Sequence, residues 1–120
     1  MNTMIDDTKR IMLRFSPGDL ERMDALLEEG MYKNRSELIR DCVRRTVLAW
    51  EYNLPVEKFD DVDAVTDRNS QVNVRFTFAE LKKMDACIFN GRFSDRTDFI
   101  RHCIKRTLPE IGRMIGKEVA

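Results

Sequence analysis

The residue types that commonly carry catalytic or metal chemistry are sparse in this chain of 120 residues. It has one histidine, His102, and three cysteines, with no Cys-x-x-Cys spacing among them, so no metal site is predicted. No nucleophile–base pair, glycine-rich phosphate loop or carboxylate cluster stands out. We therefore predict that the protein is not an enzyme and needs no cofactor.

The cysteines and the histidine are expected to have structural positions. Cys42 and Cys103 fall on the apolar faces of predicted helices, and Cys87 occupies an equally apolar position. A small buried residue is the expected role of each, in preference to a disulfide. His102 falls on a polar helix face, at the position equivalent to Asp41 in the repeat described below, and is predicted to lie at the surface.

A more specific set of polar side chains alternates with apolar ones in two short segments. Around residues 10–16, three apolar residues alternate with polar ones, and residues 71–76 repeat the pattern. The apolar positions are Ile11, Leu13, Phe15, Val72, Val74 and Phe76; the opposite positions are Arg10, Met12, Arg14, Gln71, Asn73 and Arg75. Such alternation predicts half-buried strands. A single strand needs a pairing partner, so we predict an antiparallel two-stranded ribbon.

These two segments belong to an internal repeat. Residues 9–47 align without a gap onto residues 70–108, always 61 positions apart, and thirteen of the 39 aligned positions are identical. A repeat of this kind defines the structural unit. A unit of about 40 residues is too small to bury an adequate core by itself. The two copies are therefore expected to complete one another.

In each copy the strand leads into two predicted helices. Ser16 is a favourable N-cap, with Pro17 in the first helical position, and Gly30 ends that helix. The segment Asn34-Arg35-Ser36-Glu37 has the spacing of a capping box and begins the second helix. The second copy repeats these signals at Thr77, Gly91 and Asp95-Arg96-Thr97-Asp98. The predicted fold is mainly α with a two-stranded antiparallel β-ribbon.

The expected organisation has five parts. They are an N-terminal tail (1–8), a first repeat (9–50), an acidic linker (51–69), a second repeat (70–108) and a short C-terminal helix (109–120) that follows Pro109. The linker can reach roughly 60 Å, which is enough to bring the second strand beside the first. The formal net charge is zero, but the two repeats together carry +6, and the acidic linker and tail cancel it. Basic charge is thus concentrated in the repeats.

Two further features concern location. No apolar run approaches the roughly 20 residues that span a bilayer. The first residues, MNTMIDDTK, lack the apolar segment of a secretory signal. A cytoplasmic protein without a membrane segment is expected.

With these motifs in order, the chain resembles the ribbon-helix-helix superfamily of DNA-binding proteins, the MetJ/Arc/CopG group. The resemblance rests on the segments RIMLRFSP, LERMDALLEEG and YKNRSELIRDCVRR, and on their counterpart VNVRFTFAELKKMDACIFNGRFSDRTDFIRHCIKR. It covers both repeats, about two thirds of the residues. The segment of the type Asn-Arg-Ser-Glu-x-Ile-Arg after a glycine-containing turn is its most specific part.

The resemblance implies that two copies form an intertwined unit whose paired strands enter the DNA major groove. Arginine suits guanine O6 and N7, asparagine or glutamine suits adenine, and methionine can pack on a thymine methyl group. The implied base-contacting residues are Arg10, Met12, Arg14, Gln71, Asn73 and Arg75. They are the same residues that the alternation placed opposite the core.

The resemblance also implies phosphate contacts at the start of each second helix, where free N–H groups and the helix dipole favour an anion. The matching residues are Lys33, Asn34, Arg35, Ser36, Ser94, Arg96 and Thr97. Asp95 departs from the pattern, because it stands where the first copy has Asn34 and a carboxylate repels phosphate. Either Asp95 caps its own helix, or the second anchor is weaker.

The expected function is sequence-specific binding of double-stranded DNA, as a transcriptional regulator and specifically a repressor, with no small-molecule effector evident. One chain would form a pseudo-dimer by pairing its repeats, and its two different strands would prefer a non-palindromic subsite. Two alternatives stay open. One is an accessory DNA-binding protein of a conjugative or partition complex, and the other is an antitoxin-type protein-interaction module. Pairing of repeats between chains, and a homodimer on DNA, also stay open.

Overall fold

The computed structural model describes residues 8–56, 59, 70–91 and 93–116. Its elements are β1 (Thr8–Arg14), α1 (Pro17–Leu27), α2 (Arg35–Glu51), β2 (Gln71–Thr77), α3 (Phe78–Gly91) and α4 (Arg96–Met114). The predicted mainly helical fold with a two-stranded antiparallel sheet is confirmed. Most of the predicted N-terminal tail (1–7), much of the linker (57–58 and 60–69) and the end of the chain (117–120) lie outside the described residues.

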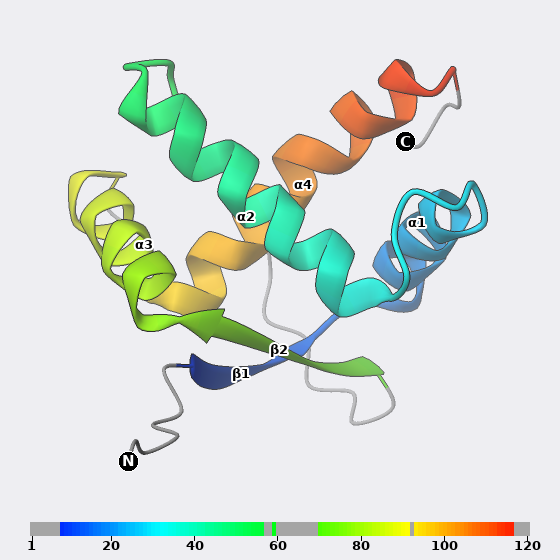
Figure 1. Ribbon diagram of the computed structural model, residues 1–120, viewed down its shortest axis with the longest axis horizontal. Coiled ribbons are helices and arrows are strands. Elements are labelled where there is room, and N and C mark those ends of the chain that lie inside the picture. The colour runs from blue at the N-terminus through cyan, green and yellow to red at the C-terminus, as the bar shows by residue number, and fades with distance from the viewer. Residues whose placement is uncertain (1–7, 57–58, 60–69, 92, 117–120) are drawn as a thin grey trace, which may run out of the picture.

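The ribbon is formed by β1 and β2 of the same chain. The strands pair antiparallel along seven residues each, from Thr8 opposite Thr77 to Arg14 opposite Gln71. The ribbon lies along one side of the molecule, where α2 and α4 cross above it and α1 and α3 lie at its two flanks (Figure 1). One face of the ribbon is therefore covered by helices, and the other is turned away from them.

A single hydrophobic core joins both halves of the chain. It is made by the inward face of the ribbon and by the apolar faces of all four helices. Its fully buried members include Leu13, Phe15, Met23, Leu26, Ile39, Cys42, Val74, Phe76, Met84, Cys87, Ile100 and Cys103. Each half covers the apolar side chains of the other, which is how two short units acquire one adequate core.

The three cysteines are free thiols inside this core, as predicted. Burial raises the pKa of the Cys87 thiol to about 11, and it also raises the pKa values of Cys42 and Cys103. These thiols stay protonated at neutral pH and act as small apolar side chains.

Local capping explains where the first helix of each half begins. The backbone N–H of Asp19 donates to Ser16 Oγ at 3.1 Å, and that of Glu80 donates to Thr77 Oγ1 at 3.1 Å. The N–H of Thr77 in turn donates to Glu80 Oε1 at 2.7 Å, which completes a capping box. After α1 the chain passes through Gly30 at φ +79°, a conformation that favours glycine.

Two predicted boundaries at the ribbon shift. The strand predicted around residues 10–16 runs from Thr8 to Arg14, because the ladder extends to the Thr8–Thr77 pair. It stops before Phe15, whose N–H donates to Ser70 O at 3.2 Å, and Ser16 is already the cap of α1. Thr8 therefore belongs to the ribbon, although it was assigned to the N-terminal tail.

The predicted break before Pro109 does not occur. α4 continues through Pro109 to Met114, so residues 109–114 are its last turns and not a separate short helix. Proline removes one backbone hydrogen bond inside a helix, which is unfavourable. Here the residues that follow it are held by packing, because Ile111 is completely buried in the core. Burial of such a side chain offsets the cost by about 1.5–3 kcal/mol.

Among the described helices, none combines the length and the apolar character that crossing a membrane requires.

Candidate functional site

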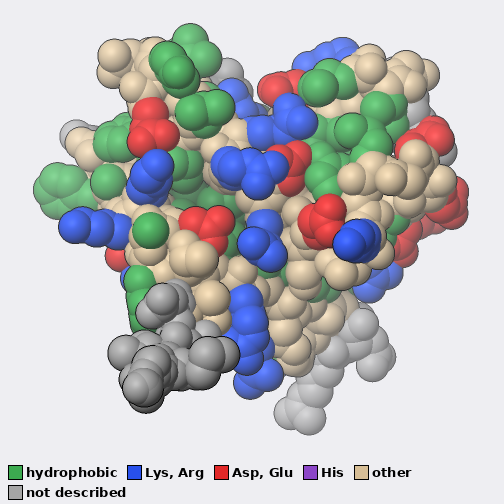
Figure 2. All heavy atoms as spheres, viewed as in Figure 1, with side chains coloured by type: hydrophobic (Ala, Val, Ile, Leu, Met, Phe, Trp, Pro, Cys, Tyr) green, Lys and Arg blue, Asp and Glu red, His purple; other side chains and the backbone are tan. Residues whose placement is uncertain are grey.

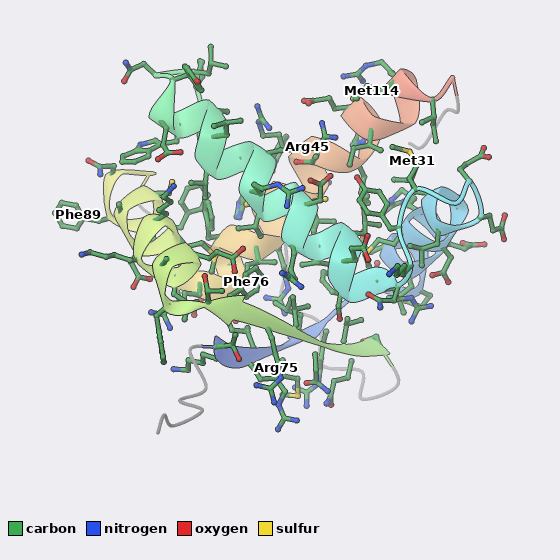
Figure 3. All side chains as sticks on the ribbon, in the orientation of Figure 1. Met31, Arg45, Arg75, Phe76, Phe89 and Met114 are labelled. Atoms are coloured by element: carbon green, nitrogen blue, oxygen red, sulfur yellow. The ribbon has the colours of Figure 1, made fainter. Side chains whose placement is uncertain are left out.

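The outward face of the ribbon brings together all six residues predicted to contact bases. Arg10, Met12, Gln71, Asn73 and Arg75 are exposed, and Met12 leaves 44% of its surface accessible although it is apolar. The sixth residue, Arg14, is only partly exposed. Arg75 points away from the helices, and Phe76, the next residue of the strand, points toward them (Figure 3). The pleat therefore separates a polar outer face from an apolar inner one.

The register gives this face an internal order. Met12 lies opposite Asn73, and these two positions are 61 residues apart, so equivalent positions of the repeat face each other at the centre. Arg10 lies opposite Arg75 on one side of this centre, and Arg14 lies opposite Gln71 on the other. The backbone is thus nearly symmetric about the Met12–Asn73 pair, but the side chains are not.

The chemistry of the face is that of hydrogen-bond donors and positive charge. Neither strand contains an aspartate or a glutamate. Arg75 Nη1 donates to Thr8 Oγ1 across the ribbon at 3.2 Å, which restrains this long side chain. Three arginines without acidic residues on the same strands produce a positive potential that favours a polyanion. Figure 2 shows Lys and Arg side chains at the ribbon end of the molecule.

The second helix of each half, α2 and α4, begins at the residues that the sequence predicts. The backbone N–H of Glu37 donates to Asn34 Oδ1 at 2.9 Å at the start of α2, and that of Asp98 donates to Asp95 Oδ1 at 2.8 Å at the start of α4. Asp95 therefore caps its own helix, which is the first of the two alternatives considered for it. Its carboxylate remains exposed, so the α4 end is electrostatically less favourable for an anion than the α2 end.

Two of the predicted phosphate-contacting residues are already engaged in ion pairs. Arg35 donates through Nε and Nη2 to the Asp24 carboxylate at 2.8 and 2.7 Å. Arg96 makes the same two bonds to Asp85 at 2.9 and 2.8 Å. These bonds lower the pKa of each aspartate. A phosphate contact by either guanidinium has to use Nη1 or the second N–H of Nη2, because the other donors are taken by the aspartate. The ion pairs also hold the two helices of each half together.

Ser36 also has a partner within the protein. Its Oγ donates to Asn73 O on β2 at 2.6 Å, and this bond fixes the start of α2 beside the ribbon. On the other strand, the guanidinium of Arg101 donates through Nη2 to Arg14 O at 3.4 Å. Sequence reasoning did not single out Arg101. Its only signal was its equivalence to Arg40 on the same helical face.

A groove of about 570 Å³ lies between β1, α3 and the start of α4. Its lining combines predicted base-contacting residues, Arg10 and Met12, with predicted phosphate-contacting residues, Arg96 and Thr97. The structure thus brings members of the two predicted sets side by side. The carboxylates of Asp85 and Asp95 also line it, in keeping with the weaker anion attraction on this side.

The prediction that His102 lies at the surface is wrong, because this residue is only 3% exposed. Its Nδ1 lies 2.7 Å from Asp98 O and its Nε2 lies 3.1 Å from Phe59 O, and the ring packs edge-on against Phe93. The equivalent Asp41 is buried as well. Each position packs against residues outside its own helix, Tyr32 for Asp41 and Phe59 and Phe93 for His102, which helical periodicity does not reveal.

Asp41 organises a polar cluster beside the core. It accepts hydrogen bonds from Tyr32 Oη at 2.5 Å and from Arg45 Nε at 2.9 Å, and it also pairs with Arg44. Burial raises the pKa of Asp41, but the hydrogen bonds from Tyr32 and Arg45 outweigh it, so the pKa is lowered overall. The pKa of Tyr32 is raised by burial and by Asp41, so its hydroxyl stays protonated and keeps donating.

Replacement of this carboxylate, Asp41→Asn, is expected to destabilise the fold at pH 7 and to flatten its acid sensitivity. A lowered folded-state pKa contributes stability that is present above the unfolded value of about 3.9 and is lost as the pH falls through the folded value. The wild-type free energy of unfolding should therefore decrease below about pH 4. Asp41→Asn removes this contribution and should cost roughly 1–3 kcal/mol at pH 7.

Urea unfolding at pH 7 and pH 3 measures both effects. Tyr32→Phe is the matched control: it removes one hydrogen bond and keeps the charge, so its acid sensitivity should lie between the other two. An Asp41→Asn protein that loses as much stability on acidification as the wild type would contradict the assignment.

Within the described ranges, no group of three or more His, Cys, Asp or Glu side chains is arranged to hold a metal ion. Comparison with curated proteins and with solved structures finds no significant match. A family model does match the segment that contains β1, α1 and α2. Residues 6–58 match the Ribbon-Helix-Helix transcriptional regulator family.

Proposed function

We propose that this protein binds double-stranded DNA sequence-specifically, with the β1–β2 ribbon in the major groove, and that it regulates transcription. The observation that carries the proposal is the outward face of the ribbon, which presents six polar or flexible side chains and no carboxylate. The major groove is wide enough for a two-stranded ribbon, and each base pair there has a distinct pattern of donors, acceptors and methyl groups. The family match over residues 6–58 supports the same function.

We propose further that one chain forms a complete pseudo-dimer from two ribbon-helix-helix repeats. Three kinds of contact support this, because each recurs 61 positions later in the chain. They are the helix caps at Ser16 and Thr77, the helix caps at Asn34 and Asp95, and the ion pairs Asp24–Arg35 and Asp85–Arg96. The ribbon pairs within the chain, with residues 71–77 as the second strand, and this pairing supports the same proposal.

The side chains of the ribbon suggest what is read. Arg10 and Arg75 lie opposite each other and are suited to guanines. Asn73 and Gln71 are suited to adenines, and Met12 to a thymine methyl group. The two ends of the face differ, because one carries two arginines and the other carries Arg14 and Gln71. The preferred subsite is therefore non-palindromic, since an operator mirrors the symmetry of the surface that reads it.

Backbone contacts at the helix starts would fix the ribbon in the groove. On the α2 side, Lys33 and Asn34 are exposed and stand beside the first N–H groups of the helix, where a phosphate is favoured. Arg35 and Ser36 hold this helix start against α1 and β2. On the α4 side, Ser94, Arg96 and Thr97 occupy the equivalent positions, with the Asp95 carboxylate among them. We infer that the phosphate anchor at the start of α2 is stronger than the one at the start of α4. We also infer that the protein is a repressor that acts by occupying its DNA site.

In vitro selection of bound duplexes, followed by sequencing, tests the proposal. The expected result is an asymmetric motif with guanines at the end read by Arg10 and Arg75, bound by one chain per ribbon site as measured by molar mass. Failure to enrich any motif would refute sequence-specific reading. Enrichment of perfect inverted repeats within the footprint of one ribbon would refute the intramolecular pseudo-dimer.

A further inference from the structure

Two arginines lie together at the end of the ribbon marked by the Arg14–Gln71 pair. Arg14 is the last residue of β1, and Arg101 lies in the second turn of α4. Arg101 Nη2 donates to the backbone carbonyl of Arg14 at 3.4 Å, so this side chain lies against the strand. Both residues are partly exposed, so a ligand can approach them from solvent.

Neither guanidinium has a carboxylate partner among the residues that the structure describes. The Nε atoms of Arg14 and Arg101 are both buried without a hydrogen-bond partner. Other arginines of the chain are compensated by aspartates: Arg22 by Asp19, Arg35 by Asp24, Arg44 and Arg45 by Asp41, and Arg96 by Asp85. A buried donor without a partner is unfavourable, and two neighbouring cations repel each other. The Nε atoms themselves are enclosed, but an anion that approaches the exposed parts of the two side chains neutralises their uncompensated positive charge.

We propose that Arg14 and Arg101 form an anion site that binds a phosphate of the DNA backbone at this end of the ribbon. This inference rests on the proposed function and refines it. This site lies at the end of the ribbon away from the start of α4, because Asp95 and Thr97 line the groove beside Arg10 and Met12. Arg14 then acts on the backbone, which agrees with its partial burial, whereas the exposed Arg10 and Arg75 are left to read bases.

The repeat offers a matched comparison for Arg101. Arg40 is the same residue at the equivalent position of α2, but it is exposed. On the α2 side, the contact between the helix and β2 is made instead by Ser36, whose Oγ donates to Asn73 O. Substitution of Arg40 and of Arg101 thus removes the same charge from equivalent positions, and only the second change alters the proposed site.

The test compares Arg101→Met with Arg40→Met and the wild type in titrations of the selected duplex and a shuffled duplex at several salt concentrations. Each phosphate contact contributes about 0.9 to the slope of log K against log salt. We expect Arg101→Met to reduce the slope by about this amount and to weaken both duplexes by the same factor. Arg40→Met should keep the wild-type slope, and so should Arg101→Lys, which preserves the charge.

Thermal unfolding separates this role from a structural one. Methionine keeps most of the apolar stem and removes the unpartnered charge, so Arg101→Met should unfold at the wild-type temperature or higher. A lower unfolding midpoint for Arg101→Met than for the wild type overturns the assignment of Arg101. So does a wild-type salt slope for Arg101→Met, when the wild type itself binds DNA. Both results leave the proposed function intact. Equal loss of slope in Arg40→Met also overturns the assignment of Arg101. A wild type that binds neither duplex refutes both proposals.

Discussion

Replacement of Arg10 and Arg75 together by alanine is expected to abolish most sequence-specific DNA binding. The two side chains lie opposite each other on the exposed face of the ribbon, at its end with two arginines. Each arginine that contacts a guanine is worth roughly 1–3 kcal/mol of discrimination. The double variant should therefore bind the selected duplex at least about 30-fold more weakly, since every 1.4 kcal/mol corresponds to about tenfold. Fluorescence anisotropy at one fixed salt concentration measures this loss.

The control removes the same charge elsewhere. Lys82 on α3 and Arg113 near the end of α4 are exposed cations outside the ribbon. Lys82→Ala combined with Arg113→Ala should change the affinity for selected and shuffled duplexes only slightly and to a similar extent. If both double variants lose equal affinity for both duplexes, the attraction is electrostatic and the ribbon reads no bases.

The largest effect on stability is expected from Phe76→Ala. Phe76 lies on the inward face of β2, is only 1% exposed and is a member of the common core. Truncation of a buried phenylalanine to alanine costs about 3–5 kcal/mol, because it removes apolar contacts and leaves a cavity. A domain is typically stable by only about 5–15 kcal/mol, so much of the total would be lost. Denaturant unfolding followed by circular dichroism measures the difference.

The same substitution at the surface provides the comparison. Phe89 on α3 is 84% exposed and points away from the fold (Figure 3). Phe89→Ala should alter the free energy of unfolding by less than about 0.5 kcal/mol. Similar values for the two variants would mean that the inward face of β2 is not part of the core.

Local patterns explain why much of the fold is predictable from the sequence. Alternation over a few residues determines which side of a strand is buried, and Leu13 and Val74 are fully buried as expected. Helix caps are equally local, because a side chain at Asn34 reaches a backbone N–H only three residues away. The identities of the outward-facing residues follow from the same alternation.

What could not be predicted depends on contacts between distant parts of the chain. His102 is buried because Phe59, from the linker, and Phe93, from the turn before α4, pack against it, and the periodicity of α4 does not indicate these contacts. Pro109 is tolerated inside α4 because Ile111 is packed into the core. The engagement of Arg35 by Asp24, eleven residues earlier, depends on how α1 packs against α2. Each outcome was decided by tertiary packing, which overrides local preference.

The pairing of β1 with β2 inside one chain also has a consequence for abundance. A ribbon assembled from two molecules falls apart when the protein is dilute, because its formation depends on the square of the monomer concentration. Two segments of one chain experience a fixed effective concentration of each other, however few copies are present. With the proposed intramolecular pairing, a single molecule in a cell carries an assembled ribbon. Mutation can also change one strand of that ribbon without changing the other.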